Sequence, residues 1–214
     1  QRLDDIDTVQ GVKVMKTTRN GETNTTVTEY VRQPPNKVRS KVIEGGQYRD
    51  EGDYRVNTGE KTYRYDASEN TYTTYDFDYN RSEGYFDADT IERVLNNSEV
   101  SYKGTDTVAG RSVHVIELTR TERDSTITIK ADQEHWYPLA YETSYSYDGT
   151  TTTMSWTHRN VSFNEQADDD TFTFEPPEVA ELKETTTPNV PEFDSLSAPN
   201  EATAYEVVKP DMPD

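Results

Sequence analysis

The chain has 214 residues, of which 41 are acidic and 22 basic, so its formal net charge is −19 at pH 7. Only 31% of the residues are hydrophobic and 29% are charged, a composition that by itself is typical of disorder. A nucleic-acid partner is not expected, because phosphate binding needs a basic stripe and the sequence has none. The chain has no cysteine, which excludes disulfides, a thiol nucleophile and a thiolate metal site.

The acidic excess indicates the solvent in which the protein works. Self-repulsion on this scale destabilises a compact chain in dilute buffer. In molar salt the Debye length falls to about 3 Å, which removes most of that penalty. The composition therefore predicts an acidic, salt-adapted protein of the halophilic archaeal kind, with an ordinary acidic surface protein as the alternative.

Apolar and polar residues alternate along most of the chain, which indicates β-strands rather than disorder. Turn signals such as Asn20-Gly21 and Asp148-Gly149 separate successive strands and predict an antiparallel meander. The expected strands are 9–18, 25–33, 37–43, 53–57, 61–66, 71–79, 99–107, 111–120, 124–130, 136–147 and 150–164. One segment, "DADTIERVLNNS" at 87–98, predicts a helix with Ile91, Val94 and Leu95 on one face.

The Asp148-Gly149 dipeptide suits a two-residue type I′ turn, which fixes the register of the hairpin around it. That register pairs Tyr145 with Thr152, Thr143 with Met154, Tyr141 with Trp156 and Leu139 with His158. One face of the hairpin is then aromatic and apolar, while the other carries hydroxyl and acidic side chains. A slip of one residue would exchange the two faces.

A second aromatic stretch, "KTYRYDASENTYTTYDF" at 61–77, has aromatic residues at alternate positions on either side of a short polar break. With the hairpin it predicts one continuous aromatic lining. The candidate cavity residues are Tyr63, Tyr65, Tyr75, Phe77, Leu139, Tyr141, Tyr145, Met154 and Trp156. Such a lining is either a filled core or a binding surface, in which Tyr contacts polar head groups and Leu, Met and Trp contact acyl chains. A sugar-stacking surface is a third interpretation.

These elements predict a mainly β protein, with few helices. About eleven strands would form a strongly curved antiparallel sheet, or half-open β-barrel, with one or two short helices as a lid. We expect this domain over 1–178, a proline-rich linker or arm over 179–200, and the start of a truncated second domain over 201–214.

No pattern in the sequence predicts catalysis, a cofactor or a metal site. His114, His135 and His158 lack the spacing of a ligand pair, and "ADDD" at 167–170 lacks the alternating ligands and the glycine of a calcium loop. Nucleophile-elbow and phosphate-loop motifs do not occur. We therefore expect a protein that is not an enzyme.

Four motifs in order carry a resemblance to a known family: "EYVRQPPNKVR", "EKTYRYDASENTYTTY", "DTVAGRSVHVIEL" and "FNEQADDDTFTFEPPE". Over roughly residues 8–178 the chain resembles the LolA-type lipoprotein-carrier superfamily, in its haloarchaeal "outer membrane lipoprotein-sorting protein" branch. The resemblance implies a half-open barrel whose helical lid encloses an apolar cavity for acyl chains. LolA carriers have an arginine just before the Pro-Asn pair, where this chain has Pro34, so the lid-locking cycle of those carriers is not implied.

The resemblance gives the functional expectation. The chain would be an extracytoplasmic, cell-surface binding protein that holds lipid or lipoprotein acyl chains. We expect a membrane tether through an N-terminal lipid anchor outside this chain, and a protein partner through the C-terminal tail. The alternative is a structural or signalling interaction module of the RseB-like sensor type, with a barrel filled by its own side chains.

Overall fold

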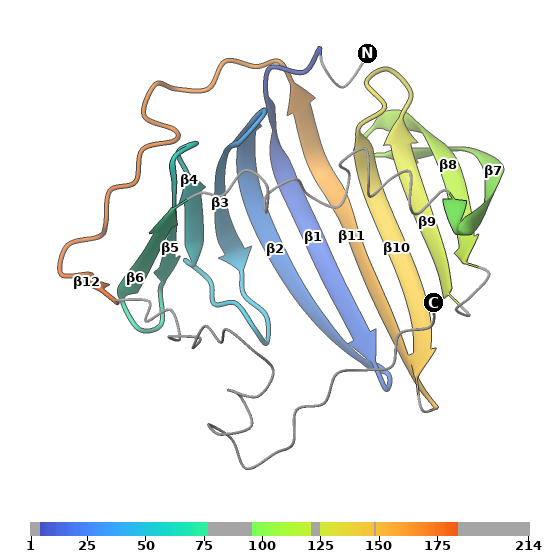
Figure 1. The fold of residues 1–214 in the computed structure, drawn as a ribbon, viewed down its shortest axis with the longest axis horizontal. Coiled ribbons are helices and arrows are strands. Elements are labelled where there is room, and N and C mark those ends of the chain that lie inside the picture. The colour runs from blue at the N-terminus through green and yellow to red at the C-terminus, as the bar shows by residue number, and fades with distance from the viewer. Residues whose placement is uncertain (1–4, 77–95, 121–124, 148, 184–214) are drawn as a thin grey trace, which may run out of the picture. The chain divides into compact units, whose positions relative to one another are not determined.

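The computed structural model describes residues 5–76, 96–120, 125–147 and 149–183. These residues form one 12-stranded sheet (Figure 1). The strands are β1 Val9–Arg19, β2 Glu22–Gln33, β3 Lys37–Glu44, β4 Tyr54–Asn57, β5 Lys61–Asp66, β6 Thr71–Asp76, β7 Ser98–Val108, β8 Arg111–Arg120, β9 Ser125–Asp132, β10 Pro138–Tyr147, β11 Thr150–Phe163 and β12 Glu181–Leu182.

The strand order is β12-β6-β5-β4-β3-β2-β1-β11-β10-β9-β8-β7. Neighbouring strands are antiparallel except for β12, which pairs in parallel with β6. The long-range pairing of β1 with β11 joins the N-terminal meander to the C-terminal one. The predicted mainly β fold is thereby confirmed, with one short strand more than the eleven expected.

Two hairpin turns set the register of the central strands. Asn20 and Gly21, between β1 and β2, have φ values of 53° and 82°, and Gly149, between β10 and β11, has a φ of 72°. These left-handed conformations are those of tight hairpin turns, which favour Asn and Gly. The register of β10 with β11 pairs Tyr145 with Thr152 and Tyr141 with Trp156, as predicted.

A β-bulge between Val12 and Lys13 interrupts the pairing of β1 with β11. Gly11 lies beside this bulge, and a Cβ atom added to it would overlap the carbonyl oxygen of Asn160. Only glycine therefore permits the two backbones to approach so closely, and the bulge increases the local twist of the sheet.

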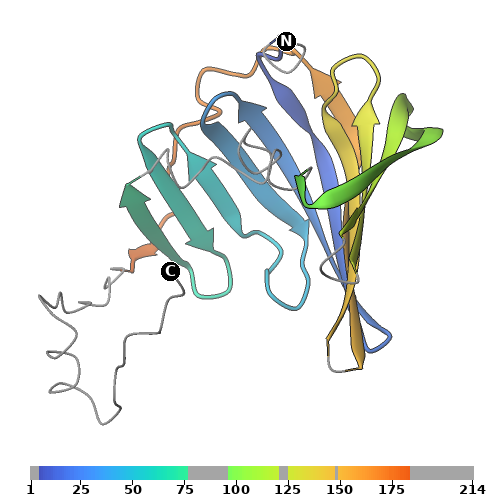
Figure 2. The same cartoon turned by 45° about the vertical axis from the view of Figure 1, so that its right-hand side comes forward.

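The sheet is open and curved. Figure 2 shows β7 and β8 turned forward out of the plane of β10 and β11, while β12 and β7 remain as separate edges. A buried cluster of Val108, Val113 and Leu139 supports the strongly turned end. Of the predicted lid helix, Ile91, Val94 and Leu95 lie outside the described residues.

After β11 the chain runs back toward the β6 edge (Figure 1). Thr171 accepts a hydrogen bond from Arg39, and Phe174 packs against aromatic rings of β4, β5 and β6. Strand β12 then adds to the sheet, so the chain still contacts it beyond the boundary predicted at residue 178. The expected arm to residue 200 and the second domain at 201–214 remain predictions, since residues 184–214 lie outside the described part.

Within the described ranges, no helix has the length and apolar character needed to cross a lipid bilayer.

Candidate functional site

One side of the sheet carries a continuous row of apolar and aromatic side chains. Directly opposed residues in antiparallel strands project to the same side, so successive pairings trace a row across the strands. This row is Tyr102, Ile116, Ile129, Tyr141, Trp156 and Met15. We call this side of the sheet the Trp156 face. The rings of Tyr141 and Trp156 stack on it, with centroids 5.9 Å apart and an interplanar angle of 10°.

A second row lies beside the first on the same face and consists of Val100, Leu118, Ile127, Thr143 and Met154. Several large side chains of the two rows remain open to solvent: Met15 is 43% exposed and Met154 is 41% exposed. Leu118 and Ile127 of the second row are buried, so the exposed apolar side chains lie at the two ends of the rows; exposed apolar groups of this size are candidates for an interaction surface.

The opposite side of the same strands carries hydroxyl rows beside a row that includes the buried Val14 and Val27, and we call it the hydroxyl face. One of its rows consists of Thr119, Thr126, Ser144, Thr153, Thr18 and Thr23. Hydroxyl pairs form across the strands, with oxygens 3.3 Å apart for Ser144 and Thr153 and 2.8 Å apart for Thr18 and Thr23. The apolar rows are therefore not a general property of these strands but belong to one face.

The centre of the Trp156 face is polar and largely buried. Tyr30 lies with its ring centroid 5.4 Å from that of His158, and the Trp156 ring lies 5.5 Å from His158. The Lys13 ammonium lies 5.9 Å from the Trp156 centroid, a distance at which a cation is attracted to an aromatic ring. Lys13 and His158 face each other directly across β1 and β11.

Burial shifts the ionisation of these groups toward their neutral forms. It lowers the pKa of His158 to about 4, against the hydrogen bond to the Leu139 carbonyl and with the help of the Lys13 charge. Burial also lowers the pKa of Lys13, and the nearby Arg32 and Arg49 lower it further. The pKa of Tyr30 is raised, mainly by burial, so this phenol remains a hydrogen-bond donor at all ordinary pH values.

The structure brings together part of the predicted cavity set. Tyr141, Tyr145, Met154 and Trp156 share the Trp156 face. Tyr75 is also on that face, since its row continues through Thr62, Asn57, Val38, Arg32 and Val9. Phe77 lies outside the described residues. Whether these residues line a ligand cavity stays a prediction.

Tyr63 and Tyr65 require a correction, because they do not share a face with Tyr75. Tyr63 pairs with Thr74, and Tyr65 pairs with Tyr72, whereas Tyr75 pairs with Thr62. On the hydroxyl-face side of the sheet, Phe174 stacks on Tyr63 at 4.5 Å and also contacts Tyr72. The prediction of one continuous lining is therefore wrong: Tyr63 packs against Phe174, and Tyr65 packs against Tyr54 and donates a hydrogen bond to Asn70.

Leu139 also differs from its prediction. The register shifts between Pro138 and Ala140, so Leu139 has no direct partner in β9. Its side chain is fully buried in the cluster with Val108 and Val113. Leu139 is a core residue, and its carbonyl accepts the hydrogen bond of His158 at 3.1 Å.

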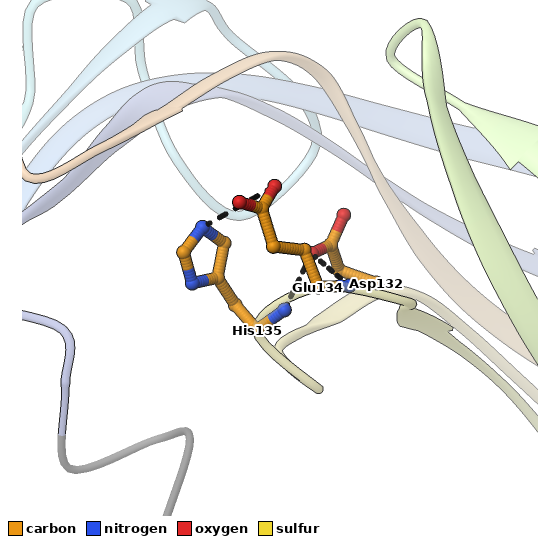
Figure 3. A group of neighbouring side chains, drawn as sticks. All are labelled: Asp132, Glu134 and His135. Atoms are coloured by element: carbon orange, nitrogen blue, oxygen red, sulfur yellow. Dashed lines mark hydrogen bonds and ion pairs between the residues drawn. The ribbon is translucent and has the colours of Figure 1, made fainter.

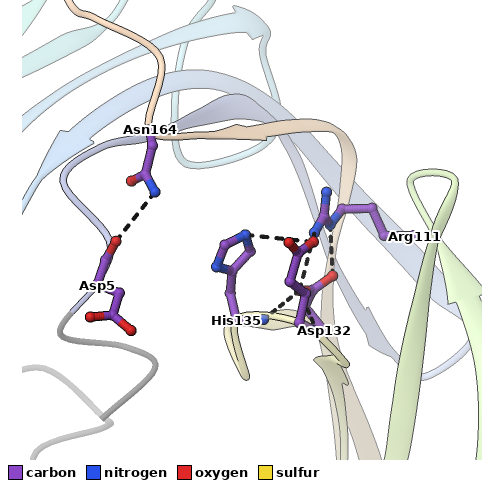
Figure 4. Close-up of polar contacts among 6 residues, drawn as sticks. Asp5, Arg111, Asp132, His135 and Asn164 are labelled. Carbon is purple, nitrogen blue, oxygen red and sulfur yellow. Dashed lines mark hydrogen bonds and ion pairs between the residues drawn. The ribbon is translucent and has the colours of Figure 1, made fainter.

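A cluster of acidic and imidazole groups lies in the turn after β9 (Figure 3). Ligand-type atoms of Asp132, Glu134 and His135 lie within 4.8 Å of one another. Arg111 occupies the same carboxylates, with its Nε 2.6 Å from Asp132 and its guanidinium 2.9 Å from Glu134 (Figure 4). Asp132 also accepts hydrogen bonds from the backbone N–H groups of Glu134 and His135. Arg111 therefore pairs with both carboxylates of the cluster, which forms an ion-paired turn.

Burial alone would raise the pKa of Asp132, but the hydrogen bonds and charge of Arg111 hold it below its usual value. Asn164, directly after β11, donates a hydrogen bond to the carbonyl oxygen of Asp5, before β1, at 3.2 Å (Figure 4). This hydrogen bond joins the segment before β1 to the end of β11.

Two hollows are present among the described residues. The larger has a volume of about 690 Å³ and lies on the hydroxyl-face side between β2, β3 and the segment containing Asp168 and Thr171. The smaller, about 480 Å³, is lined mainly by residues of that same side, including Lys130 and Glu142. Both linings mix polar and apolar residues, and the smaller hollow includes Tyr141 and Trp156 of the predicted cavity set.

Sequence reasoning missed the cluster of Lys13 and Tyr30. The Asn20-Gly21 turn could have identified it, because that turn fixes the register of β1 with β2 and places Tyr30 opposite Gly11. The bulge at Val12, which brings Lys13 opposite His158, leaves no comparable signal in the sequence.

The sheet and its sequence are similar to several known proteins. Residues 86–182 match a family described as "Predicted periplasmic protein (DUF2092)". The uncharacterized protein MJ0687 of Methanocaldococcus jannaschii is 32% identical over 170 residues, which cover 76% of this chain and 44% of that protein. The chain therefore spans less than half the length of this curated relative.

Solved structures resemble the sheet at low sequence identity. The crystal structure of MucB superposes with a TM-score of 0.54 at 14% identity, covering 81% of this chain and 60% of that one. MucB has also been solved in complex with MucA(peri). The LolA superfamily protein NE2245 of Nitrosomonas europaea has a TM-score of 0.38 at 12% identity, covering 81% and 94% of the two chains. The fold expected from the LolA-type resemblance, a strongly curved and open antiparallel sheet, is confirmed.

Proposed function

We propose that the protein is an extracytoplasmic binding protein that holds lipid or lipoprotein acyl chains against its Trp156 face. One observation carries the proposal: two rows of large apolar and aromatic side chains cross the sheet on that face and leave Met15 and Met154 open to solvent, while the reverse of the same strands carries hydroxyl rows. A face of flexible Met and stacked aromatic side chains accommodates acyl chains of differing shape.

Two further points support an extracytoplasmic binding protein. The matching family is described as periplasmic, and MucB, whose fold is similar, was crystallised with a protein partner. No step of covalent chemistry is required for this function. A lipid anchor N-terminal to the chain would keep the Trp156 face near the membrane from which the ligand comes.

The test compares two neighbouring residues of β11 that project to opposite faces. Delipidated protein is mixed with extracted polar lipids or a diacylated lipopeptide in molar KCl, and bound ligand is counted by native mass spectrometry. Because a buried charge in an apolar contact costs on the order of 2 kcal/mol, Met154→Asp should weaken binding by about tenfold or more. The matched variant Thr153→Asp adds the same charge on the hydroxyl face and should bind as the parent does.

Equal loss in the two variants, or no lipid rebinding by the parent, would reject the Trp156 face as the acyl site.

The second candidate function is an interaction module that binds a protein instead of a lipid. The edge strand β7 favours it, because its only partner among the described strands is β8, and Tyr102 on it is 61% exposed. A free edge can accept a strand from a partner. A protein partner captured without lipid, and with affinity unchanged by Met154→Asp, would favour this candidate.

A further inference from the structure

A third row on the Trp156 face, separate from the two apolar rows, contains polar groups without hydrogen-bond partners among the described residues. It runs through Gly11, Tyr30, Ser40, Arg55 and Arg64, on β1 to β5 in their order in the sheet. Gly11 and Lys13 are alternate residues of β1, so this row and Lys13 project to the same side. Gly11 and Ser40 are the direct neighbours of Tyr30 on β1 and β3.

Two atoms in this row are buried without a partner. Within the described part of the chain, the Tyr30 hydroxyl and the Arg55 Nε have no hydrogen-bond partner and almost no exposure to water. A buried donor without a partner costs about 1–3 kcal/mol, and more when the group is charged. Folded proteins rarely leave two such donors on neighbouring strands unless something else completes them.

Positive charge gathers around the same two residues. The described structure contains no carboxylate ion pair for Lys13, Arg32 or Arg55, although the chain carries a net charge of −19. Lys13 and Arg55 are largely buried, which lowers the pKa of each, and the charge of Arg49 lowers both further. Arg49 itself approaches a carboxylate only at 4.0 Å, in Asp53. The cluster thus holds uncompensated positive charge.

We propose that Lys13, Tyr30 and Arg55 bind the anionic head group of an amphiphile, a phosphate or sulfate ester, whose apolar chain lies along the Trp156 row. A guanidinium offers paired N–H donors that match these oxyanions, the phenol donates a further hydrogen bond, and the ammonium supplies charge. The 5.9 Å contact of Lys13 with Trp156 connects the head-group site to the apolar row. This assignment rests on the proposed function, and it names the chemistry of the ligand.

Another pair of cations serves as the comparison. Arg39 and Lys41 line the larger hollow on the opposite side, together with Asp168 and Asp170. Acidic side chains therefore accompany these cations, whereas they are missing from the described surroundings of Lys13 and Arg55. Arg39→Met is the matched control for Arg55→Met, because it removes the same charge from the neighbouring strand.

The experiment uses calorimetric titration of the whole chain with decyl phosphate, decyl maltoside and inorganic phosphate in molar KCl. Decyl phosphate should bind about tenfold or more tightly than the neutral compound of equal chain length. Arg55→Met and Tyr30→Phe should each lose several-fold to tenfold affinity for decyl phosphate and keep their affinity for decyl maltoside. Arg39→Met should leave both affinities unchanged.

Thermal unfolding without ligand gives an independent readout. Because Tyr30→Phe and Arg55→Met remove buried unpaired donors, the ligand-free variants should unfold at the same temperature as the parent or higher. A clear fall in the unfolding temperature of both would mean that these groups already have partners, and it would overturn the proposal.

The outcomes separate this inference from the proposed function. Equal affinity for the two decyl compounds, unaffected by Arg55→Met, overturns the anion site while acyl binding stands. If inorganic phosphate binds in an Arg55-dependent way and neither decyl compound binds, the site is one for a free anion. That result supports the anion site and overturns acyl binding. No binding of any probe overturns both.

Discussion

The buried imidazole of His158 should make the stability of the fold depend on pH. Its side chain is 5% exposed and lies among Tyr30, Tyr137 and Trp156. Its Nδ1 bonds the Leu139 carbonyl, and burial lowers its pKa from 6.5 to about 4. The folded state therefore favours neutral His158, whereas in the unfolded chain His158 binds a proton once the pH falls below its ordinary pKa.

The size of the stability change follows from the difference between the pKa values of His158 in the folded and unfolded states. Between the two pKa values the unfolded state binds more protons than the folded state, so the free energy of unfolding falls as pH falls through 6.5 toward 4. At 1.36 kcal/mol per unit, His158 should account for about 2 kcal/mol of lost stability by about pH 5 and about 3 kcal/mol by about pH 4. Below the folded-state pKa its contribution should change no further.

Urea unfolding at several pH values in molar KCl measures this contribution. Carboxylates also titrate in acid, so the informative quantity is the difference between the parent and His158→Gln, whose amide does not ionise. That difference should shrink by about 2 kcal/mol from neutral pH to about pH 5. The control His114→Gln makes the same substitution at a half-exposed imidazole and shows how much the exchange of an imidazole for an amide changes unfolding by itself. A pH-independent difference for His158→Gln would show that the imidazole is not held neutral by the fold.

Three further predictions concern the ion-paired turn, the bulge and the C-terminal segment. Arg111→Met leaves Asp132 buried without its ion pair and should cost about 3 kcal/mol in urea unfolding; a cost below about 1 kcal/mol would mean that water replaces the guanidinium. Gly11→Ala places a methyl group against fixed backbone and should cost about 3 kcal/mol, whereas Gly21→Asn, in an open turn, should cost less than about 1 kcal/mol; equal costs would refute the close approach. Phe174→Ala removes the ring packed on β4 to β6 and should lower the free energy of unfolding by about 2 kcal/mol. It should also speed proteolysis of the segment after residue 164. Unchanged proteolysis would contradict that packing.

Much of the sheet could be predicted from local chemistry. The Asp148-Gly149 and Asn20-Gly21 turns each permit essentially one register, so the pairing of Tyr141 with Trp156 followed from counting residues. Strand existence followed in the same way from alternation. The curved LolA-like form came from motif resemblance, because curvature depends on bulges such as that at Val12, which alternation does not reveal.

The errors at the site have a common physical origin. The loop between Tyr65 and Tyr72 decides which face each flanking tyrosine occupies, and the turn pairs Tyr65 with Tyr72. Tyr63 and Tyr65 are alternate residues of β5, but Tyr72 and Tyr75 of β6 are three residues apart, so Tyr75 projects to the face opposite Tyr63. Leu139 was misplaced for a similar reason, because a register shift beside it breaks the count from the turn. Alternation of apolar and polar residues predicts which side chains of one strand share a face. It does not predict which face they share with the next strand when the connection between the strands is irregular.

The net charge of the chain also conceals a local property of the sheet. At −19 the protein repels anionic surfaces at a distance, yet the pairing of β1 to β4 gathers Lys13, Arg32 and Arg55 on one face. Salt screens exposed charges over about 10 Å at 0.1 M and about 3 Å at 1 M, whereas contacts with buried groups are screened much less. Raising the salt concentration should therefore weaken the long-range repulsion more than the short-range attraction. The affinity for decyl phosphate should rise with KCl by more than that for decyl maltoside, which corrects for the effect of salt on the apolar chain. A steep fall in the phosphate affinity would instead indicate that exposed cations hold the head group, and that the buried row of Tyr30 and Arg55 does not.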